Sequence, residues 1–142
     1  MRNLLHSLEA ILFLPMPCLA VTCINRAFGP KKTLICSELL ARRVCWVNEQ
    51  LNRHLSESEV VVPAQKWLRR MGCRIPFVSC LEVACALQLW LAATGIPSHV
   101  VVGRKLDGRL LRMHAWVETN EARYFYDDSF ASLWRSDALQ ER

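Results

Sequence analysis

Cys80, His114 and the adjacent Asp127 and Asp128 are the residues of this 142-residue chain best suited to chemistry. A thiolate can attack a carbonyl carbon, an imidazole can move the proton, and a carboxylate can orient the imidazole. His114 follows Cys80 by 114 − 80 = 34 residues, and Asp127 and Asp128 come later. This set predicts a cysteine nucleophile that cleaves or transfers acyl groups. A buried free thiol is the competing interpretation of Cys80, and only one of two adjacent aspartates can face His114.

A helix that begins at Cys80 is needed to favour the thiolate form of its side chain. Ser79 followed three residues later by Glu82 is a capping-box pattern, and residues 81–91 are apolar nearly all round. Gly95 suits the position just beyond the end of this helix. The free N–H groups and the dipole of a first helical turn favour a thiolate at Cys80. Glu82 opposes this charge unless its carboxylate turns back to the Ser79 N–H. We therefore expect a buried helix with an activating N-terminus.

A sheet is needed to position the His114 imidazole, and the sequence after this helix alternates between the two faces that strands present. The predicted strands cover residues 98–103, 110–118 and 123–127, with a hairpin turn at Asp107-Gly108. Alternation places His114 on one face with Trp116 and Glu118, opposite a more apolar face. His99 is a rival base, but it lies beside three valines and is better explained as a sheet histidine. The predicted order of helices followed by an antiparallel meander indicates an α+β fold.

The first half of the chain is apolar and helical in character. Helices are predicted over residues 33–53 and 63–72, the second with Pro63 in its first turn, and residues 28–32 are expected to form a loop. Residues 4–24 are strongly apolar, although they contain Glu9, Pro15 and Pro17.

These interruptions favour a helical segment that is buried or faces a partner over a signal peptide or a membrane span. Contact with a membrane surface is a further alternative. We divide the chain into an N-terminal helical region, residues 1–62, which packs on the core or on a partner, and a core, residues 63–142.

Charge and cysteine usage restrict the class of protein. The net charge of +5 is modest, and no nucleic-acid-binding motif accompanies it, so a nucleic-acid partner is not expected. Seven cysteines occur at irregular spacing, at positions 18, 23, 36, 45, 73, 80 and 85. An odd, unpatterned set is typical of reduced cysteines in the cytoplasm. No closely spaced ligand pairs indicate zinc, so we expect neither a metal nor another cofactor.

Several short segments, taken together, resemble one enzyme family. They are Arg74-Ile75-Pro76-Phe77-Val78-Ser79-Cys80-Leu81-Glu82, Ala84-Cys85-Ala86-Leu87, Leu91-Ala92-Ala93-Thr94-Gly95-Ile96-Pro97, Val100-Val101-Val102-Gly103, His114-Ala115-Trp116-Val117-Glu118 and Tyr126-Asp127-Asp128. Over residues 66–130 the chain resembles the leader peptidases of lasso-peptide biosynthesis, the protease half of the lasso B protein. These belong to the transglutaminase-like, papain-like cysteine proteases.

The resemblance implies a transglutaminase-like core, with the nucleophile helix packed on a small antiparallel sheet, and a catalytic triad of Cys80, His114 and Asp127, with Asp128 as the next choice. It also implies a cysteine endopeptidase that removes the leader from a ribosomally made precursor peptide. A separate leader-binding protein and an ATP-dependent lasso cyclase are the implied partners, since residues 1–60 lack the strands of a leader-binding domain. The alternatives are a transglutaminase or amidase with the same triad and an inactive binding module.

Overall fold

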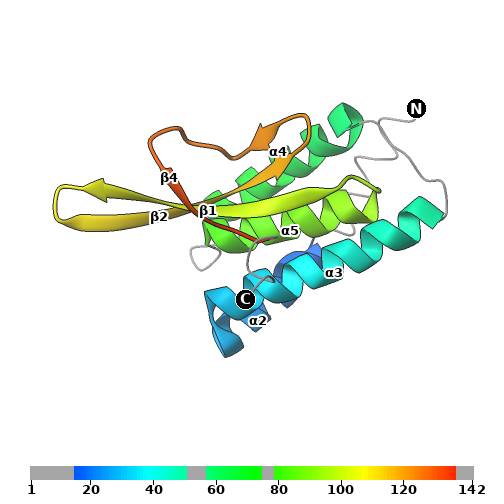
Figure 1. The fold of residues 1–142 in the computed structure, drawn as a ribbon, viewed down its shortest axis with the longest axis horizontal. Coiled ribbons are helices and arrows are strands. Elements are labelled where there is room, and N and C mark those ends of the chain that lie inside the picture. The colour runs from blue at the N-terminus through cyan, green and yellow to red at the C-terminus, as the bar shows by residue number, and fades with distance from the viewer. Residues whose placement is uncertain (1–14, 51–56, 75–78, 137–142) are drawn as a thin grey trace.

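The computed structural model describes residues 15–50, 57–74 and 79–136, in which four helices precede a four-stranded antiparallel sheet (Figure 1). The elements are α2 (Pro15–Phe28), α3 (Pro30–Gln50), α4 (Glu57–Arg74), α5 (Cys80–Ala93), β1 (Ser98–Asp107), β2 (Leu110–Thr119), β3 (Arg123–Tyr124) and β4 (Ala131–Arg135). The predicted α+β class and the helix before the sheet are confirmed.

Helix α5 is the centre of the molecule. It contacts α2, α3 and α4 as well as β1 and β2, and Figure 1 shows it between the sheet and α3. Ala84, Cys85, Leu87 and Leu91 are each fully buried. A helix that is apolar on all sides gains stability only when every side is covered, because exposed apolar surface is unfavourable in water. The prediction that this helix lies in the core is confirmed.

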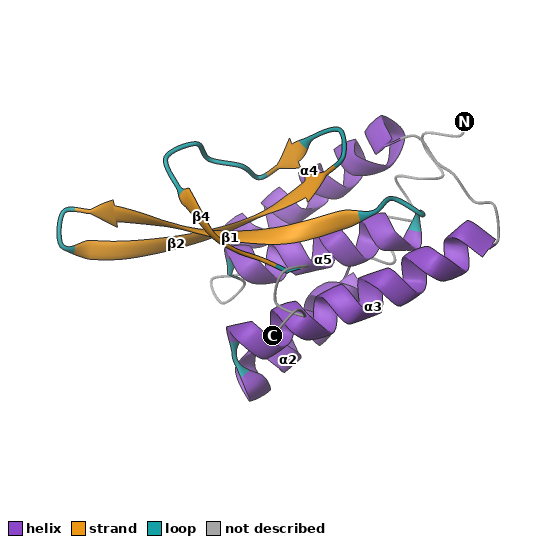
Figure 2. Cartoon of the chain, viewed as in Figure 1, coloured by secondary structure: helices purple, strands orange, loops and turns teal. Residues whose placement is uncertain are grey.

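The sheet has the strand order β3-β2-β1-β4, with β1 and β2 forming a long hairpin. Gly108 makes the turn with φ +61°, a backbone conformation that favours glycine, so the predicted Asp107-Gly108 turn is confirmed. Strand β1 continues to Asp107 instead of ending at residue 103. Figure 2 shows this hairpin extending past the helices.

The sheet differs from the prediction at two further points. The third strand ends at Tyr124 and not at residue 127, because Phe125 has φ +62° and turns the chain away from β2. Strand β4, which was not predicted, pairs with Val101–Arg104 of β1, with an irregularity between Val102 and Gly103. All of its residues are exposed, so it lacks the alternation of buried and exposed side chains that identifies a strand in sequence.

The helical half also differs from the prediction at two points. The expected loop over residues 28–32 is one residue, Gly29, whose φ of +82° ends α2 before Pro30 begins α3. Helix α4 begins at Glu57, so Pro63 lies inside the helix and not in its first turn. Proline removes one helical hydrogen bond, but burial of Val60, Val61, Ala64 and Leu68 offsets that loss.

The apolar N-terminal segment is only partly covered by the structure. Residues 4–14 lie outside the described residues, and the rest forms the first part of α2. Among the residues that the structure describes, no helix is long and apolar enough to cross a membrane. Cys18 and Val21 of α2 are buried against the core cluster that includes α5, so this face of α2 packs on the protein itself.

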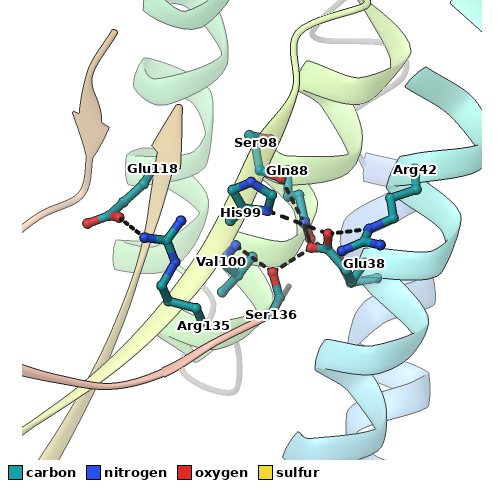
Figure 3. A network of polar contacts seen from close by, with 10 residues as sticks. Glu38, Arg42, Gln88, Ser98, His99, Val100, Glu118, Arg135 and Ser136 are labelled. Atoms are coloured by element: carbon teal, nitrogen blue, oxygen red, sulfur yellow. Dashed lines mark hydrogen bonds and ion pairs between the residues drawn. The ribbon is translucent and has the colours of Figure 1, made fainter. Parts of the chain in front are cut away.

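A buried carboxylate joins the helices to the sheet (Figure 3). Glu38 of α3 is 1% exposed and accepts hydrogen bonds from Gln88 of α5, at 2.6 Å, and from the Ser136 hydroxyl. The Arg42 Nε–H donates to Glu38 Oε1 at 2.9 Å, and His99 Nδ1 lies 3.5 Å from the same oxygen. Such a buried charge is tolerated because its oxygens have partners. The network also places His99 in β1 beside α3, as a sheet histidine rather than a base for Cys80.

Candidate active site

Cys80 is the first residue of α5, and the predicted capping box is present. Ser79, in an extended conformation, accepts a hydrogen bond from the Glu82 N–H at 3.4 Å, and its own N–H donates to Glu82 Oε2 at 2.5 Å. Glu82 is 2% exposed, and Asn25 of α2 donates to its other oxygen at 3.2 Å. The carboxylate is therefore turned back from Cys80 and engaged at both oxygens, as the thiol requires.

Asn25 is a supporting residue that sequence reasoning missed. It comes from α2, 57 residues before Glu82, and the Oδ1 of its side-chain amide lies 3.5 Å from the Thr33 hydroxyl of α3. The side chain thereby links the start of the nucleophile helix to both N-terminal helices. Nothing near Asn25 in the sequence indicates this, because the contact exists only after α2 packs on α5.

The thiol of Cys80 is exposed at the edge of the sheet. Its sulfur lies 4.0 Å from the carbonyl oxygen of Met113, the residue directly before His114 in β2. In the described part of the chain, this carbonyl is the hydrogen-bond partner of the thiol, and no hydrogen bond joins the thiol directly to His114. The fold therefore brings the predicted nucleophile to the strand of the predicted base, with one backbone carbonyl beside the sulfur.

His114 lies on the face of β2 that the alternation predicted. Its ring stacks on Trp116 at 6.3 Å between centroids, while Ala115 and Val117 are buried on the opposite face, in the core cluster shared with α5. Phe130 covers the imidazole at 5.2 Å. These aromatic rings restrict the orientations of the imidazole and shield part of it from water.

The Nε2 of His114 lies 2.7 Å from the carbonyl oxygen of Phe125. A carbonyl oxygen can only accept a hydrogen bond, so Nε2 carries the hydrogen and Nδ1 is the basic nitrogen of the neutral ring. The backbone of Phe125 thus orients the imidazole in the tautomer that can accept a proton at Nδ1. Sequence reasoning missed Phe125, because a backbone carbonyl leaves no signal in residue type.

Phe125 adopts a left-handed conformation, φ +62°, which is unfavourable for a large side chain. Its ring packs against the core cluster and under the guanidinium of Arg69 of α4, with the Arg69 Cζ 6.0 Å from the ring centroid. These contacts offset the strain and direct the carbonyl toward His114. Strained backbone of this kind is concentrated at functional sites.

The two aspartates lie in a turn and not at the end of a strand. The side-chain Oδ1 of Asp127 accepts a hydrogen bond from the Ser129 N–H at 2.9 Å, and its backbone carbonyl accepts one from the Phe130 N–H at 3.2 Å. Hydrogen bonds from the Ser129 hydroxyl and N–H lower the pKa of the exposed Asp127 carboxyl, with Lys105 and His114 as smaller contributions. The oxygen that lies 2.7 Å from His114 Nε2 belongs to the Phe125 backbone and not to Asp127. The assignment of Asp127, with Asp128 as the alternative, stays a prediction.

The sequence profile of the transglutaminase-like superfamily matches residues 35–134, which is more than half of the chain. The chain belongs to the transglutaminase-like superfamily. The match begins inside α3 and so extends well before the residues that carried the resemblance in the sequence. No curated protein and no solved structure matched the chain.

Cys80 differs from four other described cysteines in burial or in position. Burial raises the pKa of Cys85 to about 12, and burial also raises the pKa of Cys18, so both stay as unreactive thiols near neutral pH. Cys23 and Cys36 are exposed, but they lie on α2 and α3 and not at the start of a helix. Within the described residues, no group of three or more His, Cys, Asp and Glu side chains could hold a metal ion.

Proposed function

We propose that this protein is a cysteine endopeptidase that removes the leader from a ribosomally made lasso-peptide precursor. The observation that carries the proposal is the exposed Cys80 thiol at the capped start of α5, beside the strand that holds His114. Superfamily membership supports a cysteine hydrolase or acyltransferase in general. The leader-peptidase assignment is narrower, and it is supported by the combination of the segments around Cys80, Gly95 and His114.

The proposed reaction begins when His114 Nδ1 takes the proton of the Cys80 thiol. The thiolate forms a bond to the carbonyl carbon at the junction of leader and core, and the carbonyl oxygen becomes an oxyanion. The capping box engages the N–H groups of Ser79 and Glu82, whereas the N–H of Cys80 lies in the first turn, where it can donate to that oxyanion.

Collapse of the tetrahedral intermediate breaks the carbon–nitrogen bond, and His114 returns its proton to the amine of the released core. The leader remains on Cys80 as a thioester. Water then adds to the thioester carbon, gives up a proton to His114, and displaces the thiol, which releases the leader as a carboxylic acid. Asp127 is the proposed carboxylate that stabilises the imidazolium. It can do so as a nearby negative charge without a direct hydrogen bond to the ring.

A separate leader-binding protein and an ATP-dependent cyclase complete the proposal. The first presents the precursor, and the second closes the ring of the released core. Cleavage in the absence of the leader-binding protein is expected to be slow, because a small enzyme with an exposed site gains position and orientation of its substrate from the partner.

The test is incubation of the protein with candidate precursors, with and without the leader-binding protein, followed by mass spectrometry. The wild-type protein is expected to yield the leader and the core, Cys80→Ala no product, and Cys23→Ala, a matched exposed cysteine, the wild-type yield. Cleavage by Cys80→Ala at the wild-type rate would refute the mechanism. A crosslinked or deamidated product would indicate the acyltransferase alternative, and binding without any product would indicate an inactive module.

A further inference from the structure

The tip of the β1–β2 hairpin carries apolar side chains that remain in contact with water. Leu106, Leu110 and Leu111 are 70%, 68% and 61% exposed, and Met113 is 43% exposed. Cross-strand pairing places Leu106 opposite Leu111 and Arg104 opposite Met113. Leu106, Leu111 and Met113 therefore share the face that, further along β2, is covered by α5. This apolar strip continues the buried face of the sheet beyond Cys80.

The outer edge of β2 is open along the same stretch. Strand β3 pairs with Val117 and Glu118, and within the described part of the chain no strand pairs with the outer edge of β2 before them. The Thr119 N–H donates outward to Ala122, and the Met113 carbonyl faces the Cys80 thiol. Since alternate residues of an antiparallel strand point the same way, the backbone groups of Leu111 and Met113 face outward. Of these, the backbone groups of Leu111 and the N–H of Met113 are available to an added strand.

The charges of the hairpin indicate what such a strand would carry. Between residues 104 and 112 there are four basic residues, Arg104, Lys105, Arg109 and Arg112, and one acidic residue, Asp107. Asp107 forms an ion pair with Arg112 at 3.2 Å, but both side chains are more than half exposed. The pair Lys105 and Arg112 lies on the face opposite the apolar strip. Arg104 shares the apolar face with Met113, and Leu110 and Asp107 share the face of Lys105 and Arg112. An added strand would therefore meet a mainly apolar face on one side and a face of net positive charge on the other.

We infer that the outer edge of β2 binds an extended peptide that alternates apolar and acidic residues, and that the bound strand leads to Cys80. The inference rests on the proposed peptidase function and names the segment of the substrate that the enzyme holds. Backbone hydrogen bonds to Leu111 and Met113 supply pairing, and the two faces of the hairpin select the side chains. The peptide passes the thiol because Met113 pairs with the added strand and also borders Cys80.

The test measures binding separately from cleavage, on the Cys80→Ala protein. The probe is a fluorescein-labelled ten-residue peptide of alternating Val and Glu, followed by fluorescence anisotropy. Two control peptides replace Glu by Lys or methylate alternate backbone nitrogens, which prevents strand pairing. Arg109→Glu/Arg112→Glu reverses two charges of the hairpin, and Lys31→Glu/Arg43→Glu makes the same change in net charge on the exposed surface of α3.

We expect saturable binding of the acidic peptide, weakened about tenfold or more by the hairpin charge reversal and unchanged by the α3 reversal. The lysine and methylated peptides should bind much more weakly, and circular dichroism should show that each variant is folded. Equal weakening by both double variants, equal binding of the methylated peptide, or a dimer of the chain that excludes the peptide would overturn the inference. Binding at the hairpin without cleavage by the wild-type protein would refute only the proposed function, and cleavage unaffected by the hairpin variant would refute only this inference.

Discussion

Replacement of Gly103 by alanine should damage both the fold and the site, although it adds only one methyl group. Gly103 of β1 lies opposite His114 in the register of the sheet. An ideal Cβ at this position would lie 2.6 Å from two atoms of the Trp116 ring and 2.8 Å from the Ala131 carbonyl oxygen. All three distances are shorter than those that real Cβ atoms make, so the surrounding structure must move.

Neither neighbour can move easily. Trp116 is 2% exposed, its indole N–H donates to Glu118 at 3.0 Å, and its ring stacks on His114. Ala131 belongs to β4, which is paired with β1 at this point. Overpacking of this kind costs about 1–3 kcal/mol, and we expect about 2–3 kcal/mol because one clash involves backbone. That is a large fraction of the roughly 5–15 kcal/mol that stabilises a typical domain.

Urea unfolding of four proteins provides the measurement: wild type, Gly103→Ala, Trp116→Leu and the double variant. Leucine is shorter than tryptophan, so the alanine should cost at least about 1 kcal/mol less in the Trp116→Leu background. Gly108→Ala is a control with no atom within 4 Å, and it should lose about 1–2 kcal/mol through its positive φ alone in either background. An equal cost of Gly103→Ala with tryptophan and with leucine would refute the reasoning.

Three further predictions concern the core and the start of α5. Burial raises the pKa of Cys85 to about 12, so between about pH 9 and 12 this thiol is ionised in the unfolded chain and protonated in the folded protein. Its contribution to the free energy of unfolding should therefore be constant below about pH 9 and fall by about 1.4 kcal/mol per pH unit above it. Denaturant midpoints of the wild-type protein should show this fall, and those of Cys85→Ala should lack its contribution. Glu38→Ala leaves the buried Gln88 amide without its carboxylate partner, so it should lower the free energy of unfolding, measured in urea, by about 3 kcal/mol. An effect near zero would show that water replaces the carboxylate. Ser79→Ala removes the side-chain cap of α5 and should lower the free energy of unfolding by about 1 kcal/mol, measured by thermal unfolding. Ser79→Thr keeps a capping hydroxyl and should lose much less stability. Equal melting temperatures of the wild-type protein and both variants would contradict the role of the cap.

The parts of the site that depend on neighbouring residues in sequence could be predicted. Ser79 and Glu82 are three residues apart, and their capping box is decided within one helical turn. The turn at Gly108 and the side of β2 that carries His114 follow from equally local rules. For this reason the start of α5, the position of its thiol and the strand of its candidate base could be predicted from the sequence.

The remaining features depend on contacts between distant segments. Strand β4 exists because β1 offers it a partner, and Pro63 stays within α4 because the surrounding side chains are buried. The conformation of Phe125 depends on its packing against the core and Arg69, and no pattern of residue types indicates it. The buried Glu38 network likewise joins residues up to 98 positions apart. Local propensity carries no information on such contacts.

The central claim is that Cys80 is a nucleophile activated by His114, and the most direct test is its rate of alkylation by iodoacetamide. Peptide mapping at pH 7 gives separate rates for Cys80 and for Cys23 and Cys36, which are also exposed. We predict that Cys80 reacts about tenfold or more faster than the other two in the folded protein, and that His114→Ala removes this advantage while the protein stays folded. Equal rates at all three cysteines, in the wild-type protein and in His114→Ala alike, would contradict the claim.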